Sequence, residues 1–430
     1  MKPVLQVALD FMNLPRAMKV AEAAVKGGAD WIEAGTPLIK SEGLEAVRSL
    51  KKAFPNHIIV ADLKTMDVGG LETEMAGKAG ADVVTVLGVA DNGTIEEAIR
   101  AGKKYGSRIM VDLLGVEDKV RRAKELESMG VDYLCIHVGI DQQMKGRDPF
   151  EELKAITDEV SIPVAVAGGI NSESAPRAVE NGASIIIVGG AIIKSEDPKK
   201  ATEIIKKAIE EGKGIKTELY RKYREDEVRK AFELVSTPNI SDAMHRKGAM
   251  HGIIPRINRG RKMIGRAVTV RTMNGDWAKP VEAIEKAEKG DVIVIDAGGG
   301  EDAIWGELAS WSCKIKGISG VVIDGAARDI DAIKDMDFPV FSRHISSNAG
   351  EPKGYGEIGV EIVCGGQTVR EGDWIIGDES GVVVVPRERA VEIANRALDV
   401  KEHEDRIRAE IKEGKTLSEV MELDRWEKVG

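Results

Sequence analysis

The chain has 430 residues, of which 43% are hydrophobic and 4% aromatic, and its formal net charge is −10. This length predicts two domains of about 200 residues each, and the acidic balance argues against nucleic acid as a partner. No apolar run reaches the roughly 18 residues that a membrane-spanning helix needs. The cysteines, Cys135, Cys313 and Cys364, have no CxxC spacing, and the N-terminus has no signal-peptide form. Both features predict a cytoplasmic protein with reduced thiols.

A repeat of strands and helices organises the first half of the chain. Gly28, Gly80, Gly130 and Gly182 recur about every 50 residues, and each precedes an apolar run typical of a buried strand. Together with four runs halfway between them, they predict strands at 4–9, 31–32, 58–61, 83–87, 109–111, 133–138, 163–167 and 185–188. Eight such units within about 210 residues predict a TIM barrel. A doubly wound open sheet is the alternative, but it would not require four near-equal quarters.

Polar residues stand at the carboxyl ends of most of these strands. In chain order they are Asp10, Glu33, Asp62 with Lys64, Asp112 and His137. In a TIM barrel these strand ends form one mouth, where catalytic groups lie. A lone His or Asp is usually a structural group, whereas several that converge predict an active site. The segment from Asp62 to Asp67 is the densest, because two carboxylates flank Lys64; the alternative for it is a solvated ion pair.

Strands seven and eight end differently, in the glycine pairs Gly168-Gly169 and Gly189-Gly190. Glycines there let backbone N–H groups approach an anion at the start of the following helix. Barrels usually bind phosphate at these two strand ends. Paired glycines alone are weak evidence, since turns use them freely, but their place after these strands predicts a phosphate site.

With these motifs, residues 1–212 resemble 3-hexulose-6-phosphate synthases of the orotidine monophosphate decarboxylase suprafamily. The resemblance is carried by Asp62-x-Lys64-x-x-Asp67, by residues 5–10 (LQVALD), 33–37 (EAGTP) and 137–141 (HVGID), and by 189–192 (GGAI). It implies that Glu33 and Asp62 hold Mg²⁺ or Mn²⁺. It also implies a dimer in which Asp67 reaches the neighbouring subunit's site.

The resemblance further implies that ribulose 5-phosphate and formaldehyde are the substrates of a reversible aldol reaction. The metal and Lys64 would stabilise an enediolate, and His137 would shuttle the proton at C1, since imidazoles titrate near neutral pH. Asp10 and Asp67 would orient sugar hydroxyls. Decarboxylases of 3-keto-L-gulonate 6-phosphate are the alternative, but such relatives carry arginine at the positions of Ile140 and Gly190.

A glycine- and charge-rich stretch, residues 213–224, is predicted to link the barrel to a second domain at 225–430 with a C-terminal helical tail. The second domain has no eightfold repeat. Its predicted strands are 267–271, 291–296, 320–324, 339–341, 358–364 and a pair within 373–385, and its predicted helices are 280–287, 303–315 and 387–412. This pattern predicts a mixed α/β domain.

Residues 225 to about 400 resemble the RraA-like family, which includes class II 4-hydroxy-4-methyl-2-oxoglutarate aldolases and has a swivelling β/β/α fold. The motifs are residues 241–243, 305–308 and 320–329. The resemblance implies that Arg328 binds the carboxylate of a 2-oxo acid, that Asp329 holds a divalent metal and that Glu307 assists proton transfer. It also implies trimers. The alternatives are a non-catalytic oligomerisation or regulatory module and, for Arg328 and Asp329, a surface ion pair. Arg343-His344 departs from the small residues expected there.

Overall fold

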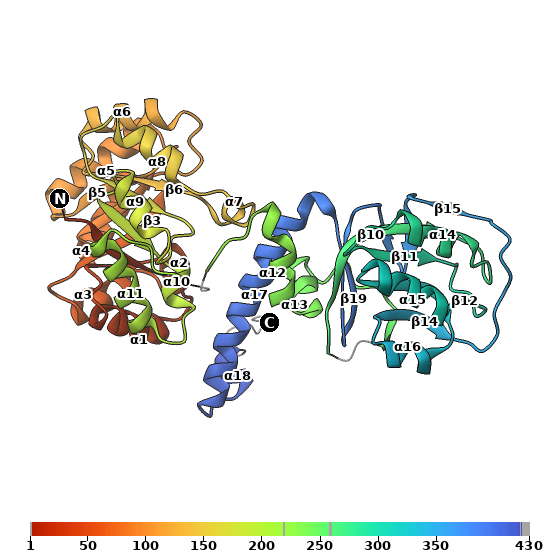
Figure 1. Cartoon of the computed structure of the whole chain (residues 1–430). Helices are drawn as coiled ribbons and strands as arrows, with labels where there is room; N and C mark the ends of the chain where they lie inside the picture. The colour runs from red at the N-terminus through yellow and green to blue at the C-terminus, as the bar shows by residue number, and fades with distance from the viewer. Residues whose placement is uncertain (1, 218–219, 258–259, 422, 424–430) are drawn as a thin grey trace, which may run out of the picture. The chain divides into compact units, whose positions relative to one another are not determined.

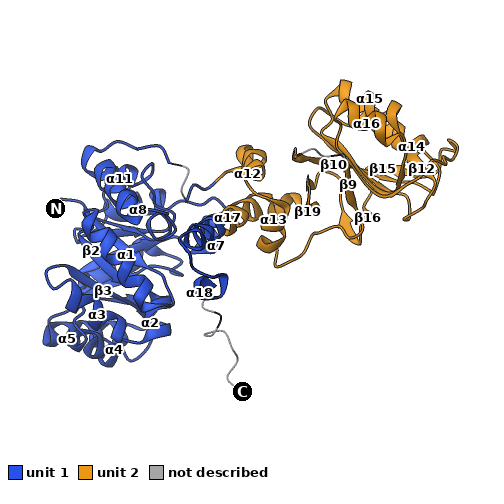
Figure 2. Ribbon diagram, turned by 90° about the horizontal axis from the view of Figure 1, so that it is seen from below, with its two compact units in different colours: residues 1–222, 402–430 blue, residues 223–401 orange. Residues whose placement is uncertain are grey.

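The computed structural model describes residues 2–217, 220–257, 260–421 and 423. Its chain forms two compact units, residues 1–222 with 402–430 and residues 223–401 (Figure 2). The tail beyond residue 402 therefore groups with the barrel, whereas the sequence-based division put it in the second domain. Contacts within this unit include an ion pair of Glu410 in the tail with Arg16 of the barrel and a hydrogen bond from the N–H of Tyr220 to Glu402 Oε1.

The first unit is a closed barrel of eight parallel strands in sequential order, as predicted (Figure 1). Its strands are β1 (Val4–Leu9), β2 (Trp31–Ala34), β3 (Ile58–Thr65), β4 (Val83–Leu87), β5 (Arg108–Asp112), β6 (Tyr133–His137), β7 (Val164–Ala167) and β8 (Ile185–Val188). Its helices are α1 (Leu14–Lys26), α2 (Thr36–Glu42), α3 (Glu45–Ala53), α4 (Gly69–Lys78), α5 (Asn92–Tyr105), α6 (Lys119–Met129), α7 (Ile140–Met144), α8 (Phe150–Thr157), α9 (Ala175–Glu180), α10 (Gly190–Ile193) and α11 (Pro198–Glu211).

Strand β3 runs four residues beyond its predicted end at Ala61, so Asp62 and Lys64 lie within it. Its register with β4 shifts between Ala61 and Thr65, and Lys64 has a left-handed backbone with φ of 51°. Such a bulge re-aims side chains at the rim of a barrel. Asp62 and Lys64 lie two residues apart on the strand, so both side chains face the barrel mouth by ordinary alternation, and the bulge changes only their local direction.

The second unit is built on one mixed sheet with strand order β19-β18-β10-β11-β13-β14-β9, joined at its sides by β12 and β15, and a separate β16-β17 hairpin. The strands are β9 (Ile254–Ile257), β10 (Met263–Arg271), β11 (Val292–Asp296), β12 (Ala303–Trp305), β13 (Gly320–Ala327), β14 (Val340–Ile345), β15 (Glu357–Ile358), β16 (Ile362–Cys364), β17 (Gln367–Val369), β18 (Trp374–Asp378) and β19 (Gly381–Val385). The α-helices are α12 (Val228–Leu234), α13 (Thr237–Ala243), α14 (Ala278–Lys286), α15 (Glu307–Lys316) and α16 (Ile330–Met336). Helix α17 (Ala390–Lys412) belongs to both units, and α18 (Leu417–Met421) belongs to the tail.

Two predicted elements of the second unit are wrong in detail. The predicted strand 358–364 is divided between β15 and β16, because Gly359 takes a left-handed backbone with φ of 85°. The predicted helix 303–315 begins as strand β12 and becomes helical only at Glu307, after an extended Gly306. Glu307 consequently stands in the first turn of α15, where backbone N–H groups point outward.

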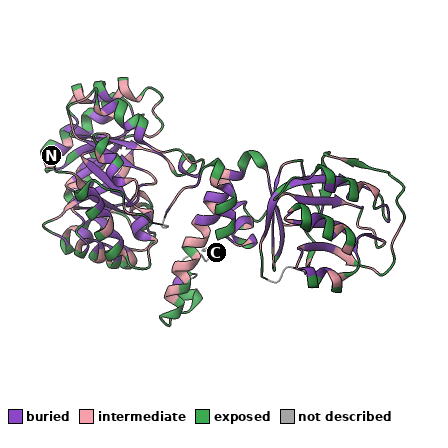
Figure 3. Ribbon diagram, viewed as in Figure 1, coloured by how far each residue is buried: buried purple, intermediate pink, exposed green. Residues whose placement is uncertain are grey.

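Each unit has its own buried core, which Figure 3 shows as purple strands in the centre of both units. Inside the barrel, eleven side chains that include Trp31, Met110 and Tyr133 fill the space between the strands. They form a floor beneath the mouth, so the barrel is packed and not a pore. Among the described residues, no helix has the length and apolar character to cross a membrane.

Candidate active site

A cavity of about 470 Å³ opens at the carboxyl ends of the barrel strands. Nine of the predicted site residues line it: Asp10, Glu33, Asp62, Lys64, His137, Gly168, Gly169, Gly189 and Gly190. Asp67 does not; it is exposed, and its Oδ1 accepts a hydrogen bond from the N–H of Val68. The structure thus brings together the residues from six different strands and leaves Asp67 on the outer surface.

Asp62 is held by three neighbouring side chains, and only 6% of its surface is exposed. Its carboxylate accepts hydrogen bonds from Thr36 Oγ1 at 2.7 Å, Thr85 Oγ1 at 2.7 Å and Lys64 Nζ at 2.8 Å. Burial alone would lower the pKa of Lys64, but the charges of Asp62 and Asp112 outweigh it and raise that pKa. Lys64 is therefore a fixed ammonium at the centre of the mouth.

His137 faces this group from β6 and is oriented by Asp112 at the end of β5. Its Nδ1 lies 2.9 Å from Asp112 Oδ2, which is also 3.4 Å from Lys64 Nζ. Burial would raise the pKa of Asp112, but the hydrogen bond and charge of His137 and the charge of Lys64 lower it overall. An ionised Asp112 only accepts hydrogen bonds, so His137 carries its proton on Nδ1. Nε2 is then the ring nitrogen that remains to exchange a proton with a ligand.

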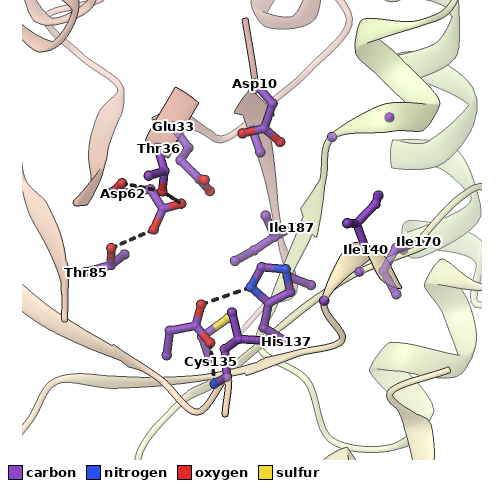
Figure 4. Close-up of a pocket in the computed structure, with 18 of the residues that line it drawn as sticks. Asp10, Glu33, Thr36, Asp62, Thr85, Cys135, His137, Ile140, Ile170 and Ile187 are labelled. Atoms are coloured by element: carbon purple, nitrogen blue, oxygen red, sulfur yellow. Dashed lines mark hydrogen bonds and ion pairs between the residues drawn. The ribbon is translucent and has the colours of Figure 1, made fainter. Parts of the chain in front are cut away.

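Three carboxylates, Asp10, Glu33 and Asp62, project into one part of the cavity, with His137 on its other side (Figure 4). The pKa of Glu33 is raised well above its usual value by burial and by the charges of Asp62 and Asp10. Asp10 is open to solvent at the mouth, yet the enclosing barrel wall and the charge of Asp62 raise its pKa as well. Lys64 is the only lysine or arginine that lines this cavity among the described residues. The acidic charge therefore exceeds the basic charge.

The same corner contains an orphaned acceptor. Gln6 donates from Nε2 to Glu33 Oε2 at 2.5 Å, while its Oε1 is buried without a hydrogen-bond partner. Excess carboxylate and an unsatisfied amide oxygen are the hard oxygen donors that Mg²⁺ and Mn²⁺ prefer. No three His, Cys, Asp or Glu side chains of the described chain form a metal-binding group. Glu33 and Asp62 fit a cation that takes its other ligands from substrate and water, as Mg²⁺ usually does.

The glycine pairs after β7 and β8 line the cavity next to Asp10, whose Oδ2 lies 3.3 Å from where a Cβ on Gly189 would be. Gly168 and Gly169 have φ of 104° and 71°, which side chains rarely adopt. Gly190 begins α10, and the backbone N–H groups there point away from the helix. This part of the cavity has the exposed backbone donors that a phosphate group needs.

In the second unit, the structure brings Glu307, Arg328 and Asp329 together. Asp329 Oδ2 accepts a hydrogen bond from the N–H of Glu307 at 3.2 Å and lies 3.6 Å from Arg328 Nε. Asp329 has a left-handed backbone with φ of 57°, an uncommon conformation that occurs at functional sites. Both side chains of the pair are nearly half exposed, at 47% and 42%. The group is an open cluster on the surface of this unit and not a closed pocket.

The departure at Arg343 has a structural reason. The guanidinium of Arg343 donates two hydrogen bonds to the carboxylate of Asp324, from Nε to Oδ1 at 2.5 Å and from Nη2 to Oδ2 at 3.1 Å. Asp324 also accepts a hydrogen bond from the N–H of Gly365 at 2.7 Å. Arg343 is therefore a partner of Asp324 on the neighbouring strand.

Sequence reasoning placed Asp112 at the mouth without a specific role and assigned no role to Thr36, Thr85 or Gln6; all four position the charged groups of the barrel. The two threonines are single hydroxyls in segments that otherwise read as ordinary strand or helix. Asp112 was noted as a strand end. The face of β5 on which it lies was the available signal for pairing with His137. A polar Gln6 inside the apolar run of β1 was the other such signal.

The fold and the charged mouth define the first unit as a TIM barrel of the enzyme type. Residues 3–205 match the orotidine 5′-phosphate decarboxylase / HUMPS family, and residues 237–384 match the Aldolase/RraA family. The chain thus belongs to the orotidine 5′-phosphate decarboxylase / HUMPS family through its barrel, and an RraA-like domain follows the barrel in the sequence.

Several curated relatives match the barrel over nearly their whole length. A 3-hexulose-6-phosphate synthase of Bacillus subtilis is 42% identical over 209 residues, which are 48% of this chain and 99% of that protein. One from Mycobacterium gastri is 42% identical over 205 residues, again 48% of this chain and 99% of that protein. A crystal structure of the Salmonella typhimurium synthase has a TM-score of 0.47 at 39% identity, covering 49% of this chain and 100% of that one. The two curated relatives support an enzyme of the lyase type.

Proposed function

We propose that the barrel condenses formaldehyde with D-ribulose 5-phosphate to D-arabino-3-hexulose 6-phosphate, and that it also catalyses the reverse cleavage. The observation that carries this proposal is the cavity in which Asp112-oriented His137 faces Lys64 and a group of carboxylates. Such a site has a base, a fixed positive charge and oxygen ligands around one small space. These are the groups that proton abstraction beside a carbonyl requires.

In the forward direction, Nε2 of His137 takes the C1 proton of the ketose, and the C2 oxygen gains the negative charge of the enediolate. C1 then bonds to the carbon of formaldehyde, and the electrons of that carbonyl move to its oxygen. His137 returns the proton to this oxygen, which becomes the new hydroxyl. Asp112 accepts from Nδ1–H throughout and stabilises the imidazolium that forms between the two transfers.

Lys64 stabilises the negative charge of the enediolate, because it is buried, ionised and fixed by Asp62. A Mg²⁺ or Mn²⁺ ion bound to Glu33 and Asp62 would supply Lewis-acid stabilisation of the same oxygens. Asp10 stands at the open rim, where it orients sugar hydroxyls. The glycine ends of β7 and β8 hold the phosphate on backbone N–H groups. Asp67, exposed on its own subunit, acts in the site of a neighbouring copy in a dimeric barrel.

The decisive test is formaldehyde consumption by the full chain with ribulose 5-phosphate and Mg²⁺, measured beside Asp62→Ala and Arg328→Ala variants. We expect consumption by the native chain and by Arg328→Ala, and its loss in Asp62→Ala. No consumption by the native chain would refute the synthase proposal. Release of CO₂ from 3-keto-L-gulonate 6-phosphate would then support the decarboxylase alternative, which Ile140 at the rim, 50% exposed and unable to bind an anion, disfavours.

For the second unit, we propose an aldolase or decarboxylase acting on a 2-oxo acid. Support comes from the gathering of Arg328, Asp329 and Glu307 around the first turn of α15. Arg328 has the fork geometry for a carboxylate, and Asp329 has the hard oxygen for a divalent metal, with water completing its shell. Pyruvate release by the full chain with Mn²⁺ or Mg²⁺, lost in Arg328→Ala, tests this. Its absence over a panel of 4-hydroxy-2-oxo acids favours a non-catalytic oligomerisation or regulatory module.

A further inference from the structure

A segment that follows the barrel lies along the loops at its mouth. The N–H of Ile215 donates to the carbonyl oxygen of Ser172 at 3.0 Å, and Ser172 Oγ donates back to the carbonyl oxygen of Ile215 at 2.8 Å. The N–H of Thr217 donates to Glu173 Oε1 at 2.8 Å. These bonds fix the segment on the loop between β7 and α9, next to the glycine-rich end of the cavity. The residues in which it ends therefore belong to the mouth.

Tyr220 lines the cavity and is only 7% exposed. Its ring lies directly against Gly190: an added Cβ atom there would lie 2.5 Å from the ring Cζ and would overlap Cε2 still more closely. Its hydroxyl lies 3.4 Å from Oε1 of Gln143, a long hydrogen bond. Gln143 in turn packs against Gly169. Tyr220 and Gln143 thus form one wall that spans both glycine pairs.

The backbone of Tyr220 is held in an unfavourable conformation. Its φ of 53° lies in the left-handed region, which is costly for an aromatic residue and persists only where surrounding contacts enforce it. One such contact is the hydrogen bond from its N–H to Glu402 Oε1 of α17, at 2.7 Å. Glu402 belongs to the tail that groups with the barrel. Two segments far apart in the sequence therefore cooperate to hold this ring at the mouth.

Positive charge gathers around the same ring. Nζ of Lys194, which follows α10, lies 5.0 Å from the ring centroid, and Nζ of Lys222 lies 4.1 Å from it. The cavity lining beneath is acidic, and Lys64 is committed to Asp62. A phosphate dianion at the glycine end needs compensating charge. The two lysines beside Tyr220 are placed to provide it.

We propose that Tyr220 is a phosphate-binding residue of the barrel site, supplied by the segment after the barrel and positioned by Glu402 of the tail. Its hydroxyl gives up the long hydrogen bond to Gln143 and donates instead to a phosphoryl oxygen of the substrate, its ring closes the cavity over Gly190, and Lys194 and Lys222 supply charge at its sides. The inference rests on the proposed function in that the ligand is a phosphorylated ketose. It adds that this barrel site is incomplete without residues beyond its own eight units.

The test compares Tyr220→Phe with the native full chain in steady-state kinetics. We expect the KM for ribulose 5-phosphate to rise about tenfold, the scale of one hydrogen bond to a charged group. The KM for formaldehyde and kcat stay within about twofold, because Tyr220 binds the phosphate and not the reacting atoms. Tyr105→Phe, on α5 and outside the cavity lining, is the matched control and leaves all three constants unchanged. Glu402→Ala raises the same KM by a smaller factor.

Isothermal titration with inorganic phosphate separates this inference from the proposed function. If the native chain consumes no formaldehyde but Tyr220→Phe weakens phosphate binding, the synthase proposal fails and the role of Tyr220 stands. Unchanged phosphate binding and unchanged KM in both Tyr220→Phe and Tyr220→Ala would overturn the inference. Tighter phosphate binding by Tyr220→Ala would also overturn it, because the ring would then obstruct the glycine loops.

Discussion

The two units hold their charged residues in opposite ways. In the barrel, Asp62 and Asp112 are 6% and 3% exposed, and each accepts several hydrogen bonds from fixed neighbours. In the second unit, Arg328 and Asp329 are nearly half exposed and meet in one loose ion pair of 3.6 Å. Buried and interlocked charges are pre-organised for chemistry, whereas exposed pairs contribute little by themselves. The charged groups of the barrel are enclosed within one chain, whereas the Arg328–Asp329 cluster is open to solvent in the described part of the chain.

The largest expected effect comes from breaking the buried cluster. Asp62→Ala removes the acceptor of three side chains and frees Lys64, so formaldehyde consumption should fall by about 1,000-fold or more. Asp329→Ala, the matched acidic residue of the second unit, should leave this rate unchanged. Initial rates at saturating ribulose 5-phosphate measure both. Equal losses in the two variants would mean that the two sites do not act independently.

Asp112→Asn tests the orientation of His137. The amide of Asn can donate its N–H to Nδ1 of His137. The ring proton then stays on Nε2, which is the wrong tautomer for taking a proton from the substrate. We expect kcat to fall by about 100-fold or more with a small change in KM. Circular dichroism would verify the fold. A KM effect without a kcat effect would show that Asp112 serves substrate binding instead.

The Asp112–His137 pair also makes the free energy of unfolding depend on pH. Although burial opposes it, His137 and Lys64 lower the pKa of Asp112 in the folded state. A lowered carboxyl pKa stabilises the fold above the unfolded value of about 3.9, and this stability is lost as pH falls through the lower folded value. Thermal unfolding between pH 3 and 6 should therefore show a steeper acid loss for the native chain than for Asp112→Asn.

The pKa of Glu33 is shifted in the opposite direction from that of Asp112. This shift gives a test for a bound metal that does not depend on activity. Burial and the charges of Asp62 and Asp10 raise its pKa, so its ionisation at higher pH costs stability in the folded state. A divalent cation would offset that cost. Mg²⁺ should therefore raise Tm more at pH 8 than at pH 5, and EDTA should reverse the gain. Glu33→Gln should remove the pH dependence of the Mg²⁺ effect; an undiminished effect would move the metal elsewhere.

The barrel could be predicted because its signals are local and repeated. Gly28, Gly80, Gly130 and Gly182 all have positive φ, from 86° to 97°, as expected for glycines that end helices before strands. The mouth followed from topology, since parallel strands deliver their carboxyl ends to one side. Asp10, Glu33 and His137 were therefore found from their positions in the sequence alone.

The remaining features depend on contacts between distant segments. The hydroxyls of Thr36 and Thr85 became recognisable only when they met Asp62, 26 and 23 residues away. Glu402 reaches Tyr220 across 182 residues, and no local pattern marks a tail that returns to the barrel. In the second unit, Gly306 and Gly359 interrupt stretches whose composition suggests single elements. Side-chain pairs and backbone breaks of this kind depend on tertiary contacts, which the hydrophobic periodicity of a sequence does not reveal.

The smallest effect on activity is expected for the apolar residues beside the Glu307, Arg328 and Asp329 cluster. Changing them also tests whether this open cluster is covered in the assembled protein. Leu308 and Ile315 of α15 are each 82% exposed, and Trp311 between them is 43% exposed, so one helical face beside Glu307 is uncovered. We propose that another copy of this chain covers this face, as the trimers implied by the RraA resemblance would require. Leu308→Glu with Ile315→Glu should lower the mass measured by light scattering while formaldehyde consumption stays constant. Leu234→Glu on α12, which exchanges another exposed apolar residue for the same charge, should leave the mass unchanged. An unaltered mass in the double variant would contradict assembly through α15, and the second site would then be open in the assembled protein as well.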